Sequence, residues 1–539
     1  MPASAPAPAL PRLSRWSALP DWSIAALMGL AAWMLVAVAL DPAGDYPRSP
    51  MGPGLTVDEI YNVLPGVELC DRMLAGDLAG MERVESGLHD HPPLGRAAIG
   101  VFHETGLLWS PPQGEHAALV VACARLASAF EFGLLIALIT WFAQRWEGRT
   151  AGIVAGISVI LMPRVFGHAH IAALETPMML TCVAVVLVAA DRWGDISPPT
   201  WRSAILLGVL WGLALLAKIQ AILLPIPIAL WVLFVWRRRA VLPLVMVGVI
   251  GLCVFLAGWM WLWGDPLGRS REFFASTTER AVIWVTYFGQ KYADRALPWH
   301  YPWVLFLITL PVGLLALGIW GTIANAPTRR GALLLAVLLF TLCVFSVPGV
   351  AVYDGVRLFV YVFPLWGIFA GIGAQRLFMT LRSRLTAAVA ALPVIILLIC
   401  QAWGCFAYAP CWLSYFNVLT GGVAGAERWG LETTYWSDSV TRELLERTAE
   451  LAPRGSVVEF APVLHHLQLP ALESQCPALR EKEIRLQAWS GEARSGALVL
   501  SFPRRAYLPE NWTPAPPRGR VLAEVVRGGV RLAALYEIE

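Results

Sequence analysis

The chain has 539 residues, of which 57% are hydrophobic and only 15% are charged. A soluble globular protein usually carries about 25% charged residues, so the polar side chains here are too few to cover a soluble surface. The mean hydropathy of +0.60 and the 25 tryptophans exclude a disordered chain and an ordinary cytosolic enzyme. The net charge of +3 is too small to indicate a nucleic-acid partner. The composition therefore favours a multi-pass membrane protein.

Eleven apolar segments are predicted to cross the membrane, because a bilayer core about 30 Å thick takes roughly 20 apolar residues to span as a helix. Nine of them are 22–40, 117–143, 204–217, 219–236, 241–263, 301–321, 331–347, 356–374 and 385–403. Two shorter ones, 150–162 and 172–190, flank a polar stretch from Pro163 to His170. A cleaved signal peptide is the alternative for 22–40, but its apolar stretch exceeds the ~7–15 residues usual in signal peptides.

The odd number of crossings puts the two termini on opposite sides. Every second short loop collects arginines, which predicts a cytoplasmic N-terminus and an extracytoplasmic C-terminal segment. The predicted organisation is a cytoplasmic tail over 1–21, a transmembrane body over 22–404 with an outer loop at 41–116, and an extracytoplasmic domain over 405–539. The Pro-rich start, residues 2–11, is predicted to be a flexible tail by composition.

The C-terminal region changes character after residue 411, where charge rises. Alternating runs from Ser456 to Phe460 and from Ala497 to Leu500 predict strands, and Glu443 to Glu450 predicts a helix between them. The fold class predicted is therefore a mainly α membrane bundle with a small α/β C-terminal domain. Cys405, Cys411 and Cys476 lie outside the spans, where an oxidising compartment would permit a disulfide.

Ionisable side chains near membrane depth are costly and usually mark a site or a pathway. Here they gather at the outer ends of the spans, which favours chemistry on the outer face over a transport route through the full depth. The group comprises Asp58, Glu59, Asp90, His91, Arg96, Arg164, His168, His170, Glu175, Lys218, Asp354 and Arg357.

The first outer loop carries two features of interest. The acids of Thr56-Val57-Asp58-Glu59 precede Ile60, Val63, Leu64 and Val67, whose spacing predicts an amphipathic helix along the membrane surface. The alternative is that the acids only complement the helix dipole. The later stretch from His89 to Arg96 contains two prolines that favour extended backbone. A metal site at its histidines is the alternative, but no dedicated ligand set accompanies them.

Short motifs follow in chain order and on one side of the predicted membrane. They are Asp58-Glu59, His91-Pro92-Pro93-Leu94-Gly95-Arg96, Ala124 to Ala129, Pro163 to Pro177, Gly212 to Lys218, Tyr353 to Phe359 with Pro364, Leu413 to Asn417, Gly421-Gly422 and Glu432 to Trp436. Their order resembles that of the GT-C glycosyltransferases, and more narrowly the group of protein O-mannosyltransferases and aminoarabinose transferases (glycosyltransferase family 39 and its bacterial relatives). The likeness covers roughly residues 22–436.

The resemblance implies a polyprenyl-phosphate sugar donor, transfer on the outer face, and an acceptor protein, lipid or glycan. A phosphate leaving group needs stabilisation of negative charge rather than an acid. Asp58 would then be the general base for an acceptor hydroxyl or amine, and direct displacement with one base implies inversion. The resemblance further implies that Glu59 assists catalysis, that the donor phosphate is bound by His91, Arg96, Lys218 and Arg357, and that sugar or acceptor is positioned by Glu175, Asp354 and His168.

Several alternatives stay open from the sequence. Lys218 could snorkel at a helix turn, Arg357 could form a structural ion pair with Asp354, and His168 could be a packed loop residue. The chain departs from relatives with Glu175 in place of Asp, and from aminoarabinose transferases with His91 in place of Lys. A transporter or flippase of lipid-linked sugars and a non-catalytic scaffold are the rival functions. No cofactor or resident metal is expected, and the expected location is the inner membrane of a Gram-negative bacterium.

Overall fold

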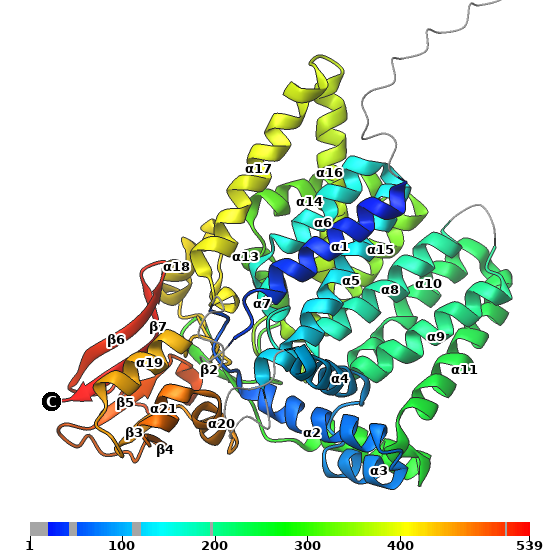
Figure 1. The fold of residues 1–539 in the computed structure, drawn as a ribbon. Coiled ribbons are helices and arrows are strands. Elements are labelled where there is room, and N and C mark those ends of the chain that lie inside the picture. Colours follow the sequence, from blue (N-terminus) through cyan, green and yellow to red (C-terminus); the bar gives the residue numbers. More distant parts are fainter. Residues whose placement is uncertain (1–19, 42–50, 110–119, 195–197, 513–514) are drawn as a thin grey trace, which may run out of the picture.

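The chain folds into a large helical body and a C-terminal domain built on a five-stranded sheet (Figure 1). The computed structural model describes residues 20–41, 51–109, 120–194, 198–512 and 515–539. The predicted fold class, a mainly helical bundle with a small α/β domain at its C-terminal end, is confirmed. The proline-rich stretch 2–11, predicted to be flexible, lies outside the described residues.

Each predicted apolar segment contains a helix. The helices of the body are α1 (Asp21–Ala37), α5 (Val121–Glu147), α6 (Arg149–Ile160), α7 (Pro163–His168), α8 (Glu175–Trp193), α9 (Trp201–Ala217), α10 (Pro225–Trp236), α11 (Val241–Gly258), α13 (Tyr301–Thr309), α14 (Val312–Asn325), α15 (Arg329–Val344), α16 (Val362–Arg382) and α17 (Ala387–Tyr408). Within the described residues, five helical segments are long and apolar enough to cross a membrane, or six if α13 and α14 form one span. Eleven crossings therefore stays a prediction.

The segment predicted as one span, 301–321, is broken into two helices by a sharp bend. The axes of α13 and α14 meet at 111°. Pro311 has no N–H to continue the helix, and the residue before it, Leu310, is extended with ψ 135°. The Asn417 side-chain amide donates to the carbonyls of Leu307 and Leu310, both at 2.7 Å. A residue of the sequence motif thus satisfies backbone groups that the break leaves open.

Helices and a hairpin outside the predicted spans gather at one end of the body, at the bottom of Figure 1. They are α2 (Val57–Leu74), α3 (Leu78–Gly87), α4 (Leu94–Trp109), α12 (Pro266–Glu279), and the hairpin β1 (Trp284–Tyr287) with β2 (Gln290–Ala293). The amphipathic helix predicted after Thr56 is confirmed as α2, which a capping box between Thr56 and Glu59 starts. Its Ile60 and Val63 are buried, whereas Leu64 is exposed.

The C-terminal domain has the strand order β4-β3-β5-β7-β6. β3 (Val457–Ala461) pairs in parallel with β4 (Arg485–Ala488) and β5 (Leu498–Ser501), while β7 (Val530–Ile538) pairs antiparallel with β5 and β6 (Gly519–Arg527). Its helices are α18 (Gly422–Arg428), α19 (Arg442–Leu451), α20 (Gln468–Gln475) and α21 (Pro477–Glu481). The predicted strands and helix are confirmed as β3, β5 and α19.

The cysteines considered for a disulfide, Cys405, Cys411 and Cys476, are all free. Cys411 and Cys476 are fully buried, and the Cys405 thiol lies 3.6 Å from the carbonyl oxygen of Ile160. Each thiol therefore packs against the fold separately.

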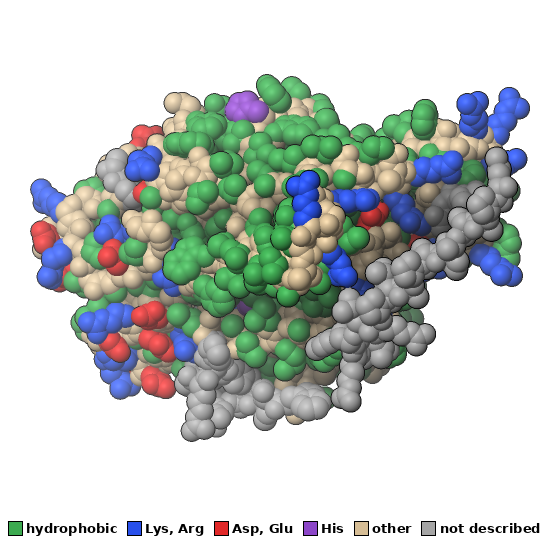
Figure 2. Space-filling view, turned by 90° about the horizontal axis from the view of Figure 1, so that it is seen from above, with side chains coloured by type: hydrophobic (Ala, Val, Ile, Leu, Met, Phe, Trp, Pro, Cys, Tyr) green, Lys and Arg blue, Asp and Glu red, His purple; other side chains and the backbone are tan. Residues whose placement is uncertain are grey.

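Apolar side chains cover much of the outer surface of the helices. Figure 2 shows hydrophobic side chains over most of the body, whereas side chains of both charges gather at the left, over the C-terminal domain. Helices α11 and α17 expose many large apolar side chains, among them Leu242, Val249, Ile396, Ile399 and Phe406. Such surface is typical of lipid contact and would be costly in water.

Helices α2 and α4 approach closely at two glycines, and this contact fixes α2 against the body. A Cβ on Gly100 would lie 1.9 Å from the carbonyl oxygen of Gly66. We expect Gly100→Ala to destabilise the fold by about 2 kcal/mol, within the range for overpacked sites, and to lower the melting temperature of purified protein. Gly87→Ala is the control, because a Cβ there meets nothing within 4 Å. Equal melting temperatures for the two variants would contradict the close packing.

Candidate functional site

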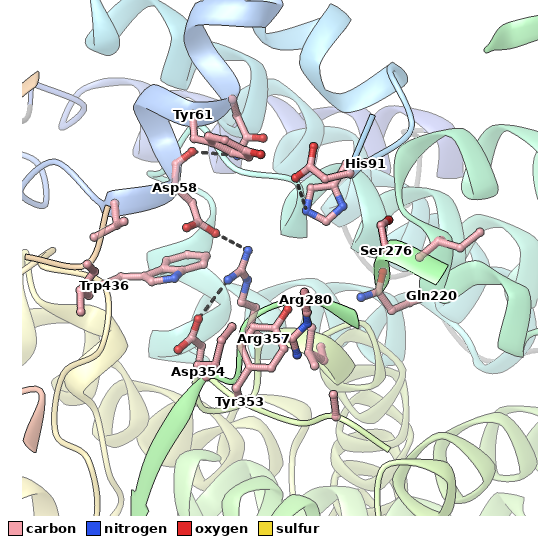
Figure 3. A pocket seen from close by; sticks show the side chains of 18 of the residues that line it. Asp58, Tyr61, His91, Gln220, Ser276, Arg280, Tyr353, Asp354, Arg357 and Trp436 are labelled. Carbon is pink, nitrogen blue, oxygen red and sulfur yellow. Dashed lines mark hydrogen bonds and ion pairs between the residues drawn. The ribbon is translucent and has the colours of Figure 1, made fainter. Parts of the chain in front are cut away.

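A cavity of about 710 Å³ lies where the α2 end of the body meets the C-terminal domain. Its wall comes from several distant parts of the chain: α2, the loop before α4, the turn after α9, the end of α12, the stretch between α15 and α16, and residues at 436, 464 and 504–507. In Figure 3, Asp58 and Asp354 both point to Arg357, with His91 across the space and Trp436 beside it. The sequence-predicted residues that line the cavity are Asp58, His91, Asp354 and Arg357.

Arg357 is held by three carboxylates and an indole ring. Its Nε donates to Glu175 Oε1 at 2.8 Å, and its Nη1 donates to Asp354 Oδ2 at 3.0 Å. Its Nη2 pairs with Asp58 Oδ2. The guanidinium carbon lies 4.4 Å from the centroid of the Trp436 ring, within cation–π distance. These partners fix both the plane of the guanidinium group and its direction toward the cavity.

The charges around Arg357 balance. Lys218 also pairs with Glu175, and Arg504 Nη2 pairs with Asp354 Oδ1 at 2.9 Å. The network therefore holds the cations Lys218, Arg357 and Arg504 against the carboxylates of Asp58, Glu175 and Asp354. Buried charges are tolerated only when they are paired in this way.

Asp58 stands in the first turn of α2 and is the most exposed acid of this network, with 27% of its side chain accessible. Burial raises its pKa, Arg357 lowers it, and the neighbouring carboxylates of Asp354 and Glu175 raise it further, so that the pKa lies above its ordinary value of 3.8. A partly accessible carboxylate with a raised pKa suits proton acceptance better than a fully exposed one does.

His91 lines the cavity but carries no charge at neutral pH. Burial lowers its pKa to about 4, although Asp90 opposes this effect. Its Nε2 lies 3.7 Å from Asp90 Oδ2. If His91 helps to hold phosphate, as expected from the sequence, it does so as a neutral imidazole that donates a hydrogen bond and not as a cation.

Arg96 does not line the cavity, in contrast to the sequence-based expectation. Its Nε donates to Asn62 at 3.2 Å, and its Nη groups donate to the carbonyl of Leu88 and to Asp90, both at 2.8 Å. The side chain is 4% exposed. Arg96 fixes the loop that carries His91 and has no free face toward a phosphate.

Glu59 also lies outside the cavity and is fully buried. It accepts two hydrogen bonds from Arg125 on α5, at 2.6 and 2.7 Å, and another from the backbone N–H of Ala172 at 2.9 Å. It caps the start of α2 through the Thr56 N–H at 2.8 Å. Through these contacts Glu59 anchors the helix that presents Asp58, and its expected catalytic role stays a prediction.

Lys218, Glu175 and His168 form a layer behind the cavity wall. Lys218 and Glu175 are each about 1% exposed, so Lys218 does not snorkel to the surface. His168 is fully buried and packs edge-on against Trp436, with 5.5 Å between ring centroids. These residues act on the cavity through Arg357 and Trp436 rather than by touching its contents.

Several cavity residues were not singled out from the sequence. Tyr61 follows Asp58 by one helical turn, and helical spacing in α2 could have indicated it. Arg280 contacts the ring of Tyr353, with 4.6 Å between the guanidinium carbon and the ring centroid. No local pattern marks Arg280, or Arg504 of the C-terminal domain, because each reaches the cavity through the tertiary fold.

Within the described part of the chain, no group of three or more His, Cys, Asp or Glu side chains is arranged to hold a metal ion. The prediction that the protein needs no resident metal or cofactor stays a prediction.

The family model of dolichyl-phosphate-mannose-protein mannosyltransferases matches residues 90–261. The fold is similar to that of ArnT from Cupriavidus metallidurans, solved in the apo state and bound to undecaprenyl phosphate. In both cases the TM-score is 0.50 and the identity 14%, over 95% of this chain and 97% of that chain. The chain resembles the GT-C glycosyltransferases in sequence and in fold.

An oligosaccharyltransferase from Archaeoglobus fulgidus also matches, with a TM-score of 0.41 and 14% identity over 71% of this chain and 55% of that chain. No curated protein matches this chain. The ArnT likeness shows the fold, and the match to the mannosyltransferase family model supports a lipid-linked sugar transferase in general.

We expect Glu59→Gln to destabilise the protein strongly, because it leaves the fully buried Arg125 without its counter-charge. Breaking such a pair costs about 3–5 kcal/mol. The measurement is the melting temperature in detergent, with the yield of monodisperse protein. Glu68→Gln is the control, since its ion pair with Arg72 is exposed and such pairs contribute about 0–1 kcal/mol. A stable Glu59→Gln protein that has lost only turnover would restore the catalytic assignment.

Proposed function

We propose that this protein transfers a sugar from a polyprenyl-phosphate donor to a hydroxyl or amine of an acceptor, with inversion at the anomeric carbon. The reaction takes place in the cavity at the α2 end, which we place on the extracytoplasmic face of a bacterial inner membrane. The observation that carries this proposal is the pairing of Asp58 with Arg357 on the cavity wall. It places a proton acceptor next to a cation that can bind a phosphate.

The leaving group is a phosphate, which is stable as an anion. In the proposed reaction the acceptor oxygen or nitrogen bonds to the anomeric carbon while the bond from that carbon to the phosphate oxygen breaks. The acceptor proton passes to Asp58, and the electron pair of the broken bond stays on the phosphate. Arg357 stabilises that charge, and neutral His91 can donate a hydrogen bond across the cavity.

Three of the five N–H groups of Arg357 are directed at carboxylates, one each on Nε, Nη1 and Nη2. Glu175 and Asp354 are each held by a second cation, Lys218 and Arg504 respectively. Asp58 has no second ion pair among the described residues, and it is the most exposed of the three carboxylates. We therefore expect donor phosphate to replace Asp58 at Nη2 of Arg357, which frees the carboxylate to accept a proton.

Sidedness follows from charge. Arginine-rich segments lie at the end of the helices opposite the cavity, for example Arg237–Arg239 between α10 and α11, and Arg382 and Arg384 at the end of α16 and just after it. The rule that basic loops stay in the cytoplasm supports an N-terminus inside and a C-terminal domain outside.

Replacing Asp58 by Asn should slow transfer by about 10²–10⁴-fold, the usual contribution of a general base. In the unchanged protein, kcat/KM should fall as the pH drops through the pKa of Asp58, which is raised above 3.8, because protonation removes the base. The residual rate of the variant should lack this acid limb. The assay is sugar transfer from polyprenyl-phosphate donor in proteoliposomes over a pH series.

Asp71→Asn provides the matched control, because Asp71 is on α2 but faces solvent. It should keep both the rate and the acid limb. Full turnover by Asp58→Asn in the presence of donor would be incompatible with the base assignment.

The orientation can be measured with cysteines placed at two positions and a charged, membrane-impermeant maleimide applied to intact spheroplasts. Glu68→Cys on the exposed face of α2 should react, and Arg238→Cys between α10 and α11 should react only after lysis. The unsubstituted chain measures the background from its own thiols. The reverse pattern would invert the proposed topology.

A further inference from the structure

One arginine reaches the cavity from the C-terminal domain. Arg504 follows β5 closely and precedes the short helical turn Arg505–Tyr507. Its guanidinium carbon lies 4.8 Å from the centroid of the Tyr507 ring, and the Tyr507 hydroxyl accepts the backbone N–H of Trp284 at 3.0 Å. The loop after β5 is thus fastened to the β1–β2 hairpin, beside the helical body.

Arg504 joins the two segments that flank Arg357. Its Nη2 donates to Asp354 Oδ1 at 2.9 Å, and its Nη1 donates to the backbone carbonyl of Tyr435. Asp354 orients Arg357 through its other carboxylate oxygen, and Trp436, next to Tyr435, covers the face of the same guanidinium group. A single side chain therefore fixes both the ion-pair partner and the stacking partner of Arg357.

The backbone at Asp354 has an uncommon conformation that the two arginines help to hold. Asp354 has φ 54° and Gly355 has φ 67°, so two successive residues adopt the left-handed conformation. This conformation is uncommon for a non-glycine residue, although Asp adopts it more readily than most. Asp354 is 3% exposed, and the two arginines at its carboxylate are the contacts that hold it.

We infer that Arg504 is a positioning residue of the cavity and that the C-terminal domain is a working part of the site. Without Arg504, Asp354 would carry a single cation and the loop before α16 would be free to relax. Arg357 would then lose its fixed direction toward the cavity. This inference rests on the proposed function for its ligand, a polyprenyl phosphate, but its effect on the loop does not depend on that ligand.

The test is a double-mutant cycle with Arg504→Gln and Asp354→Asn in the full-length protein in nanodiscs. The probe is undecaprenyl phosphate, and its Kd is the readout. Each single variant should raise the Kd about tenfold. This is the lower end of the loss seen at metal sites when a residue that orients a ligand side chain is removed. The double variant should be no weaker than Asp354→Asn alone, because Arg504 acts through Asp354. The inference would be overturned if the fold-changes of the two single variants multiplied in the double variant, or if Arg504→Gln left the Kd unchanged.

Hydrogen–deuterium exchange gives a second readout without any ligand. Arg504→Gln should speed exchange in the peptide that spans residues 353–359, and Arg505→Gln should leave it unchanged. Arg505 is the matched control because it is adjacent, one-third exposed and paired only loosely with Glu427, at 3.5 Å. Unchanged exchange in that peptide for Arg504→Gln would also overturn the inference.

Two outcomes separate this inference from the proposed function. If the unchanged protein does not bind undecaprenyl phosphate, the proposed function fails, while the exchange experiment still decides the role of Arg504. If Arg504→Gln does not fold, Arg504→Lys replaces it. Lys keeps the charge but cannot bridge Asp354 and the Tyr435 carbonyl with one planar group. Arg504→Lys should therefore also speed exchange in the 353–359 peptide and weaken binding of undecaprenyl phosphate. Exchange and Kd equal to those of the unchanged protein would contradict the inference.

Discussion

The structure around the cavity depends on the neutralisation of one buried arginine. Arg357 is 7% exposed, and an unpaired cation in that position would cost several kcal/mol. The carboxylates that pair with it come from α2, from the start of α8 and from the loop before α16, which are far apart in the sequence. The requirement to pair this charge therefore draws three distant elements together, and it creates the cavity wall as a consequence.

The same network favours a catalytic site over a purely structural ion pair. A structural pair needs equal cation and carboxylate charge and gains nothing from a partner that can leave. Here Glu175 and Asp354 are each doubly held, whereas Asp58 is singly held and borders the cavity. In the proposed reaction an incoming phosphate takes the place of Asp58, so Arg357 stays paired, and the freed carboxylate is the most accessible of the three.

The sequence predicted the parts of this site that local chemistry marks. Asp354 and Arg357 stand at the start of a predicted span, Asp58 and His91 stand in motifs of the first outer loop, and all four line the cavity. The sequence did not show that Asp58 and His91 would line the cavity while Glu59 and Arg96 would not. A shift of one or a few residues along a helix or loop decides which side chain faces inward. Glu59 turned toward Arg125, a partner 66 residues away. The bend at Pro311 was missed because hydropathy does not register a lost N–H.

The contribution of Arg504 lay beyond sequence reasoning for a different reason. Its partner, Asp354, is 150 residues earlier, and nothing near Arg504 in the chain is unusual for a charged domain surface. Yet a soluble domain is a suitable source for this side chain. An arginine added to the apolar body would need a further buried acid, whereas the loop after β5 brings its own charge to the membrane boundary and pairs it with an acid already present. The docked position of the C-terminal domain therefore also completes the charge network.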